Sequence, residues 1–326
     1  MKAAGIISTV LWMVLSGCIC AAQDPAIPTT LPGRLIKLNL LVTDHADQAV
    51  DDVSKDDVQV LENDKPQTIA SFEKDNRPVS YVLAIDTSGS FRSILPRILT
   101  DSERLVSKNR ELDETMLIRF ISSNKIEKVR EFTRNETEIL QDFKLLRIED
   151  GQSAVIDAIY LSVQTAAARK AGDPLIHRAV VVISDGEDRA SYYKKEDLIK
   201  LLRASDVQVF IIGVVEQLDD SRGGYMRPSP RQAAVDLLAK IADESGGRLF
   251  IPHTTDQFAT AIDEIERDLH MQYLVGYETH DLSDEGFRKI RVKIDNSPNQ
   301  KKRFAIARPG YFINPPDLEG KKKKKS

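Results

Sequence analysis

A short apolar run, Val79–Ile85, constrains the fold of this chain more than any other stretch, because it stops abruptly at an acidic residue. A continuous apolar run of this length is typical of a strand that is buried on both faces of a parallel sheet. Ligands of open α/β sheets bind just beyond the carboxyl ends of such strands. Asp86, Ser88 and Ser90 stand at that point, and their oxygens suit Mg²⁺, Mn²⁺ or Ca²⁺. The run therefore predicts a cation site at one edge of a parallel sheet.

Two further segments place polar groups at the same predicted edge. A second apolar strand, 178–184, ends at Asp185, and a small polar turn that contains Ser153 leads into a helix at 154–168. Strands alternate with helical patterns from residue 78 to residue 270, which predicts an α/β fold with a doubly wound, mainly parallel sheet. Helix capping explains each Asp or Ser singly. Five such side chains converging on one sheet edge favour a metal site instead.

This combination resembles the metal-ion-dependent adhesion site of von Willebrand factor type A domains, and the resemblance covers residues 78–270. The family pattern is Asp-x-Ser-x-Ser after the first strand, a Thr in a Gly-rich turn and an Asp after the fourth strand. Ser153 stands where the family usually has Thr, which keeps a hydroxyl but loses a methyl that restricts the rotamer. The resemblance implies a divalent cation, with Mg²⁺ preferred and Mn²⁺ or Ca²⁺ as alternatives, held by Asp86, Ser88, Ser90, Ser153 and Asp185.

A site with only two carboxylates leaves positive charge on the ion and room for another ligand. The expected partner is a protein that presents an Asp or Glu, and water fills the position when no such ligand is available. Glu187 and Asp188 are not counted as ligands; they either orient metal-bound water or are exposed acids. The side chains expected to meet the partner are of types enriched at interfaces, with an ordinary surface loop as the alternative: Arg189, Tyr192, Tyr193, Tyr225, Met226 and Arg227.

Segments 34–77 and 271–315 flank this domain and alternate like half-buried strands. Neither flank is large enough to bury a good core alone. We therefore expect them to pair in one small all-β sandwich into which the domain at 78–270 is inserted. The expected strands are 34–43, 56–62, 68–72, 272–277, 288–294 and 303–307, with a turn at 62–66.

The first 22 residues are expected to be an export signal, because Lys2 precedes an apolar stretch that is too short for a comfortable membrane span. Two processing routes are open. Cys20-Ala-Ala22 fits ordinary signal peptidase, whereas Leu15-Ser-Gly-Cys18 resembles a bacterial lipobox, in which Cys18 is lipidated and attaches the protein to the membrane. The mature protein is expected to be extracytoplasmic, either periplasmic, secreted or anchored by lipid.

Cysteine content and charge narrow the class of protein further. Both cysteines lie in the signal, so the folded region has no disulfide framework. A net charge of −4 gives no electrostatic argument for nucleic acid. A Pro- and Thr-rich linker is expected at 23–33, and residues 316–326 are expected to be a basic, disordered tail.

Segments spread over nearly the whole mature chain resemble the bacterial von Willebrand factor A-related exported proteins best known from Acidobacteria. That resemblance implies a fold and a metal site more than a biological role. The matching segments are 56–72, 86–90, 184–188, 244–248, 272–277 and 307–311.

An enzyme is the main rival class, because Asp86 and the acidic segment 185–188 also resemble haloacid-dehalogenase-type phosphatases with an aspartate nucleophile. The second Asp of that pattern is here Ser88, and the required Lys has no convincing candidate beside His177 and Arg178. We therefore interpret the chain as an exported binding module for adhesion or envelope assembly and not as an enzyme. A metal-independent structural envelope protein is the other alternative.

Overall fold

The computed structural model describes residues 34–170, 173, 175–221, 228–279, 286–295 and 302–313. Several sequence predictions lie outside the described residues: the signal with Cys18, the linker at 23–33, the interface residues Tyr225, Met226 and Arg227, and the tail at 316–326. In the part of the chain that is described, no helix is long and apolar enough to cross a membrane.

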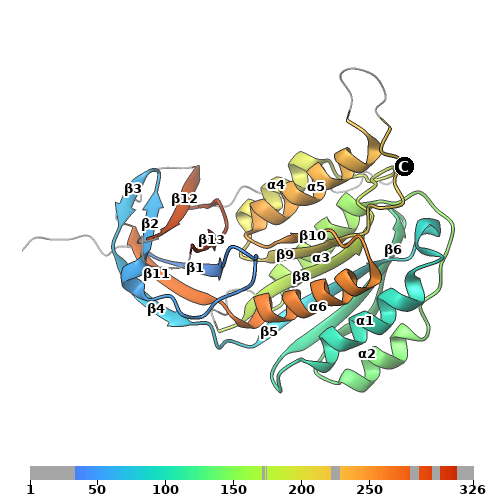
Figure 1. Cartoon of the computed structure of the whole chain (residues 1–326), viewed down its shortest axis with the longest axis horizontal. Coiled ribbons are helices and arrows are strands. Elements are labelled where there is room, and N and C mark those ends of the chain that lie inside the picture. Colours follow the sequence, from blue (N-terminus) through green and yellow to red (C-terminus); the bar gives the residue numbers. More distant parts are fainter. Residues whose placement is uncertain are drawn as a thin grey trace, which may run out of the picture. The chain divides into compact units, whose positions relative to one another are not determined.

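A six-stranded sheet in the order β10-β9-β8-β5-β6-β7 forms the centre of the α/β domain (Figure 1). The edge strand β7 (Lys125–Thr133) runs antiparallel to its neighbour β6. The other pairs are parallel, which confirms the predicted mainly parallel sheet. The parallel strands are β5 (Val79–Asp86), β6 (Glu114–Ser122), β8 (His177–Ser184), β9 (Gln208–Gly213) and β10 (Leu249–Phe250).

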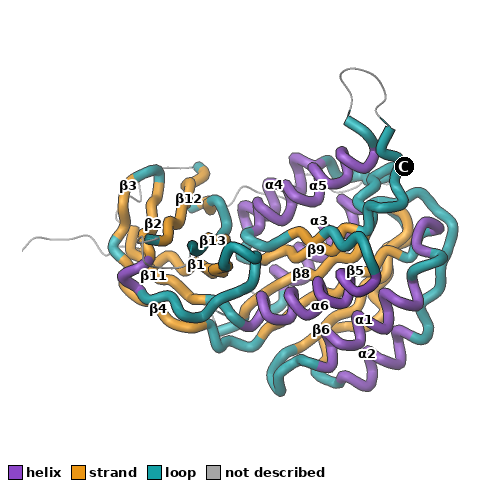
Figure 2. The backbone as a smooth tube through the Cα atoms, viewed as in Figure 1, coloured by secondary structure: helices purple, strands orange, loops and turns teal. Residues whose placement is uncertain are grey.

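Helices cover both faces of this sheet. Successive side chains of each strand point to opposite faces, and because both sets are apolar, each face needs a layer of helices to bury it. Val82 and Ala84 of β5 belong to a core shared with α3 (Val155–Ala168), α4 (Lys195–Ala204) and α5 (Pro230–Ser245). Leu83 and Ile85 belong to a second core shared with α1 (Leu95–Ser107), α2 (Glu136–Phe143) and α6 (Thr255–His270). Figure 2 shows the helices against the strands of the sheet. The doubly wound fold class is confirmed.

The two flanks of the α/β domain pair with each other in two four-stranded sheets. One sheet has the order β13-β1-β11-β4, with β1 (Arg34–Thr43) antiparallel to β11 (Tyr273–Thr279). The other has the order β14-β12-β2-β3, with β2 (Val58–Glu62) antiparallel to β12 (Phe287–Ile294). One apolar cluster draws on both sheets. The remaining strands are β3 (Lys65–Gln67), β4 (Ile69–Lys74), β13 (Phe304–Ile306) and β14 (Gly310–Phe312), and two short 3₁₀ turns span Lys55–Asp57 and Gly89–Phe91.

The predicted turn at 62–66 is too long. Only Asn63 and Asp64 form the loop, and both have positive φ (48° and 63°), which Asn and Asp tolerate better than most residues. Lys65 and Pro66 already belong to β3, where Pro66 lies opposite Leu61. Proline is accepted there because β3 is an edge strand, so its missing N–H removes no bond to a further strand.

A buried carboxylate, Glu62, joins strands from both flanks inside the sandwich. It accepts hydrogen bonds from the hydroxyls of Tyr277 (2.8 Å), Thr279 (2.8 Å) and Tyr311 (2.9 Å). Arg288 Nη1 lies 3.2 Å from Glu62 Oε1, and both side chains are 3% exposed. Because β2, β11, β12 and β14 all contribute, this network connects segments that are more than 200 residues apart.

His177, at the start of β8, gives the fold a pH dependence that can be measured. Its Nε2 lies 2.5 Å from Gln208 Oε1, and complete burial lowers the pKa of the imidazole below its ordinary value of 6.5. Since the folded pKa is below the unfolded one, the unfolded chain binds more protons, so stability is lost as pH falls below about 6.5. In His177→Gln this loss is expected to be smaller. Urea unfolding of both proteins from pH 8 to pH 5 measures the difference, and parallel profiles would contradict it.

Candidate metal-binding site at the carboxyl edge of the sheet

Two aspartates stand side by side where adjacent parallel strands end. Asp86 is the last residue of β5, and Asp185 follows the last residue of β8. These two strands are paired up to Ile85 and Ile183, so their carboxyl ends meet at one edge of the sheet. Both side chains are buried, with Asp86 fully inaccessible. The position agrees with the rule that ligands bind at the carboxyl ends of parallel strands.

Hydrogen bonds connect the five residues predicted as ligands to one another. Ser153 Oγ donates to Asp86 Oδ2 at 3.1 Å, and Ser90 Oγ donates to Asp185 Oδ2 at 2.9 Å. The hydroxyls of Ser88 and Ser90 lie 3.2 Å apart. Segments 67 and 95 residues apart in the sequence thus converge on one group of oxygens.

A sixth side chain, Ser184, belongs to the same group and was missed by the sequence analysis. Its hydroxyl donates to Asp86 Oδ2 at 3.1 Å and accepts from the backbone N–H of Gly186 at 3.1 Å. The signal that could have found it is its position immediately before Asp185, at the end of the strand. The sequence pattern identified Ser184 only as the last residue of the strand at 178–184.

Local backbone geometry explains why small residues surround the aspartates. Ser88 N–H donates to Asp86 Oδ1 at 2.9 Å, which turns the chain directly after the strand. A Cβ on Gly151 would lie 2.5 Å from Ile121 Cγ2, so the turn that carries Ser153 can lie this close to β6 only with glycine. Gly186 has φ of +76°, a conformation that favours glycine, directly after Asp185.

Helix capping does not account for these residues. Ser88 is the N-cap of the 3₁₀ turn Gly89–Phe91, yet its side chain makes no capping hydrogen bond. The N-caps of α1 and α3 are Ile94 and Ala154, which have no side-chain oxygen. The hydroxyls of Ser90 and Ser153 point to the aspartates instead. The capping explanation therefore fails for this group of oxygens.

The electrostatics of the site favour a bound cation. Burial, with a further contribution from the nearby Asp185 charge, raises the pKa of Asp86 to about 6. Burial also raises the pKa of Asp185 above its ordinary value. Among the described residues, no lysine or arginine forms an ion pair with either aspartate, and buried charges without a partner are costly. In the described chain no group of three or more His, Cys, Asp or Glu side chains could hold a metal ion, so most ligands here would be hydroxyls.

The segment after Asp185 is tied to the start of α3 by a second set of contacts around Asp157. The backbone N–H groups of Tyr192 and Tyr193 each donate to the Asp157 carboxylate at 2.8 Å. Ser191 Oγ accepts from Asp157 N–H at 3.0 Å and donates to Asp188 at 2.5 Å. We call Asp157 with Ser191 and Asp188 the loop clamp.

The loop held by the loop clamp also binds Ser153, because backbone N–H groups of this loop donate hydrogen bonds to the Ser153 carbonyl oxygen. The N–H groups of Arg189 and Ala190 lie 2.8 and 3.1 Å from the Ser153 carbonyl oxygen. The loop that begins at Asp185 and the turn that carries Ser153 are therefore one connected piece of structure. Asp188 acts inside this piece as a hydrogen-bond acceptor and not as an exposed acid.

Three of the residues predicted to meet a partner can be placed. Arg189 is exposed and pairs with Glu187 at 2.6 Å. Tyr192 is 51% exposed. Tyr193 instead stacks on Tyr160 of α3, with ring centroids 3.7 Å apart and nearly parallel planes, so one face of its ring is covered. Arg189 and Tyr192 are therefore better placed than Tyr193 for contact with another molecule.

Asp157→Asn is expected to weaken cation binding about 10- to 100-fold, although Asp157 does not join the oxygen group itself. The amide replaces one acceptor of two backbone N–H groups, so the loop after Asp185 loses its fixed position. The measurement is the rise in unfolding temperature on adding Mg²⁺. Asp142→Asn, which removes a comparably buried carboxylate paired with Arg130, is the matched control. Equal cation responses in both variants would contradict the prediction.

The fold is a doubly wound α/β domain, and its candidate site is a group of Asp and Ser side chains at the carboxyl edge of the sheet. Together they define the class of protein: an α/β domain with an oxygen-rich candidate metal site. The family profile of the von Willebrand factor type A domain matches residues 82–266, which is more than half of the chain. The protein therefore belongs to the von Willebrand factor type A domain family. Domains of this family commonly carry a metal-ion-dependent adhesion site and take part in protein–protein interactions.

Solved structures give further similarities. The conserved hypothetical protein BatB from Bacteroides thetaiotaomicron is 19% identical with a TM-score of 0.43, over 58% of this chain and 98% of that one. The SpRpn10 VWA domain is 14% identical with a TM-score of 0.41, over 57% and 94%. Proximal thread matrix protein 1 from the mussel byssus, with zinc in its MIDAS motif, is 14% identical with a TM-score of 0.46, over 62% and 48%. A comparison with curated protein sequences gives no match.

Proposed function

We propose that this protein is an exported binding module that uses a divalent cation to hold an acidic group of a protein partner. The observation that carries the proposal is the pair of buried aspartates, Asp86 and Asp185, each of which accepts a hydrogen bond from a serine hydroxyl and neither of which pairs with a basic side chain in the described chain. The ion would be bound by Asp86, Ser88, Ser90, Ser153 and Asp185, with Mg²⁺ first and Mn²⁺ or Ca²⁺ as alternatives.

The proposed chemistry follows from the charge of the site. When bound, the cation supplies a Lewis-acidic position. Two carboxylates balance its formal charge, and the other protein ligands are neutral hydroxyls, so the ion can still attract a further anionic oxygen. An Asp or Glu of a partner is the group that best completes such a set of oxygen ligands. Arg189 and Tyr192, both exposed on the loop after Asp185, would contact the same partner.

Two further parts of the proposal concern place and activity. The apolar segment at residues 6–17 supports export, as in the exported von Willebrand factor A-related proteins of Acidobacteria. The exported protein would be periplasmic, secreted into the medium, or attached to the membrane by a lipid on Cys18. The proposal includes no enzymatic activity, because Ser88 occupies the position where an aspartate-nucleophile phosphatase needs its second Asp. The role would be adhesion or assembly of the cell envelope.

Calorimetric titration of the full chain with Mg²⁺, Mn²⁺ and Ca²⁺ tests the first half of the proposal, with one ion per chain as the expected result. The second half is tested by capture from envelope extracts with Mg²⁺ or with EDTA, in which a specific partner is expected only with the cation. Asp185→Ala is the control in both assays. A partner retained equally in EDTA and by Asp185→Ala would favour the metal-independent structural alternative.

A further inference from the structure

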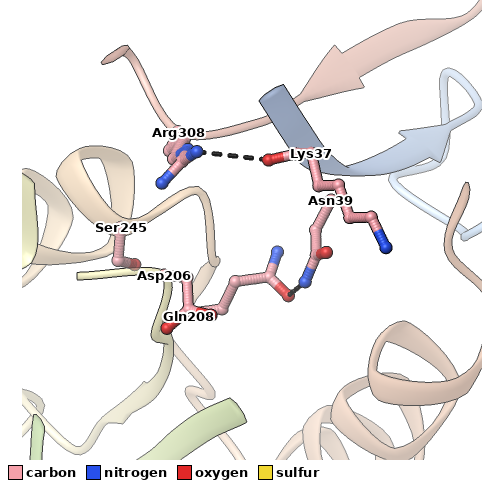
Figure 3. A pocket seen from close by; sticks show the side chains of 6 residues that line it. All are labelled: Lys37, Asn39, Asp206, Gln208, Ser245 and Arg308. Carbon is pink, nitrogen blue, oxygen red and sulfur yellow. Dashed lines mark hydrogen bonds between the residues drawn. The ribbon is translucent and has the colours of Figure 1, made fainter. Parts of the chain in front are cut away.

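A cavity lies between the sandwich and the α/β domain, near the amino ends of the parallel strands. This is the opposite end of those strands from Asp86 and Asp185. Figure 3 shows Asn39 of β1 pointing to Gln208 at the start of β9, and Arg308 after β13 pointing to the backbone carbonyl of Lys37. Lys37, Asp206 and Ser245, at the end of α5, complete the lining. An adjoining cavity of about 280 Å³ shares several of these residues. Its charged lining comprises Lys37, Arg77, Asp173, Arg178, Asp206 and Arg308.

Backbone packing fixes one wall of this cavity. A Cβ on Gly246 would lie 2.4 Å from the backbone nitrogen of Arg308, so the glycine turn after α5 lies directly against the backbone of Arg308. Gln208 Nε2 donates to the Gly246 carbonyl at 2.8 Å, and Asn39 Nδ2 donates to Gln208 Oε1 at 3.3 Å. Two sequence segments without an assigned role, 244–248 and 307–311, therefore meet here and hold Arg308 at the cavity.

Three of the six charged side chains in this lining, Arg77, Arg178 and Asp206, already form ion pairs. The Asp173 carboxylate accepts a backbone N–H from Leu175 and forms no ion pair among the described residues, so it adds one negative charge. Arg77 is bound by Asp75, with Nη2 2.7 Å from Oδ2. Arg178 is 4% exposed and pairs with Asp206 at 3.1 Å, and its other N–H groups reach backbone carbonyls. These two pairs contribute little net charge to the cavity.

Arg308 and Lys37 differ from the other basic residues. The Arg308 guanidinium donates to the Lys37 carbonyl oxygen at 3.2 Å and lies 5.6 Å from the centre of the Tyr311 ring. Neither Arg308 nor Lys37 has a carboxylate within ion-pair distance in the described part of the chain. Burial lowers the pKa of Arg308, which reflects a guanidinium that has lost part of its hydration. The Asp206 carboxylate lies beyond ion-pair distance and offsets this cost only in part, so an anionic ligand would reduce the free energy of the partly desolvated guanidinium.

We propose that the adjoining cavity of about 280 Å³ binds a small phosphate-class oxyanion, with Arg308 as the main contact and Lys37 adding positive charge. The planar guanidinium offers parallel N–H groups that match phosphate oxygens. A volume of about 280 Å³ is just below the usual range of about 300–1,000 Å³ for small-molecule sites, so inorganic phosphate or a small phosphate ester fits. Because residues of both the sandwich and the α/β domain line the cavity, a bound anion would stabilise their contact.

Thermal unfolding of the full chain in EDTA tests this site apart from any cation. Sodium phosphate is expected to raise the unfolding temperature in a saturable way, relative to sodium chloride at equal ionic strength. Arg308→Gln is expected to weaken phosphate binding about tenfold or more. Asp206→Asn is expected to strengthen it, because Asp206 competes for Arg178 and repels an anion. Arg291→Gln, on the exposed surface of the sandwich, is the matched control and should respond as wild type.

A second measurement, phosphorus NMR line broadening of phosphate by the wild-type protein, needs no variant and covers the case in which Arg308→Gln fails to fold. Glycerol phosphate tested beside inorganic phosphate distinguishes an ester or headgroup source from the free ion. A phosphate response that is absent, or equal in Arg308→Gln and wild type, would overturn the proposal. So would stabilisation by malonate alone, which would assign the cavity to carboxylates. Asp86→Ala is expected to keep the full phosphate response, because its site lies at the other end of the strands.

Discussion

Asp86→Ala is expected to abolish the stabilisation of this protein by divalent cations. A cation at about one hundred times its dissociation constant stabilises the folded state by about 2.7 kcal/mol. For a domain of this size the unfolding temperature of the wild type should rise by about 5–10 °C. Asp86 accepts hydrogen bonds from Ser153 and Ser184, so its loss removes one carboxylate and releases two of the neighbouring hydroxyls. Thermal unfolding with EDTA and with each cation measures the effect.

Asp86→Asn separates the loss of binding from the loss of packing. The amide keeps the size of the side chain but removes a buried charge that faces Asp185. Without cation it should unfold at the temperature of the wild type or above, whereas with Mg²⁺ it should gain nothing. A full Mg²⁺ response in Asp86→Asn would show that the ion binds elsewhere. Asp101→Asn, which alters a buried aspartate paired with Arg97 on α1, is the matched control.

Glu62→Ala is expected to destabilise the protein by about 3–5 kcal/mol, the range for removing one partner of a buried ion pair. The variant leaves a cavity at a carboxylate that binds Tyr277, Thr279, Tyr311 and Arg288. Because these residues follow the α/β domain in the chain and Glu62 precedes it, the effect depends on the pairing of the two flanks. The midpoint of urea unfolding is the measurement.

The matched control for this prediction is Glu62→Gln. It preserves the volume of the side chain and one carbonyl acceptor, so it should cost clearly less than Glu62→Ala. Glu73→Ala, on the edge strand β4, removes an exposed carboxylate and should change stability by about 0.5 kcal/mol or less. Equal effects of Glu62→Ala and Glu73→Ala would contradict a role for the buried network.

The sequence predicted which segments form helices and which form strands better than it predicted the residues at which these elements begin and end. The apolar spacing of the sequence predicts helices at 233–245 and 258–269, and in the structure both begin three residues earlier, at Pro230 and Thr255. Their N-caps, Ser229 and Thr254, accept hydrogen bonds from the backbone three residues on. The prediction began each helix near its first apolar residues, whereas a helix begins at its cap. The strand β3 was missed because Lys65 and Pro66 were assigned to the turn at 62–66, and β14 was not predicted either.

The sequence alone determined the α/β domain and the place of its candidate metal site. The apolar run before Asp86 and the second run before Asp185 require buried strands, and parallel strands bring their carboxyl ends to one edge. These are local patterns, and the alternation of strands with helices leaves few topologies open.

Only the tertiary structure decided which distant groups meet. Ser184 contacts Asp86, Asp157 holds the backbone at Tyr192 and Tyr193, and Gly246 lies against Arg308. Apart from the position of Ser184 directly before Asp185, these contacts have no signature in spacing or composition, because each depends on strand order, register and the packing of one loop on another. Local sequence fixes which elements form and where their polar ends lie, whereas contacts between those elements are set by the packing of the whole chain.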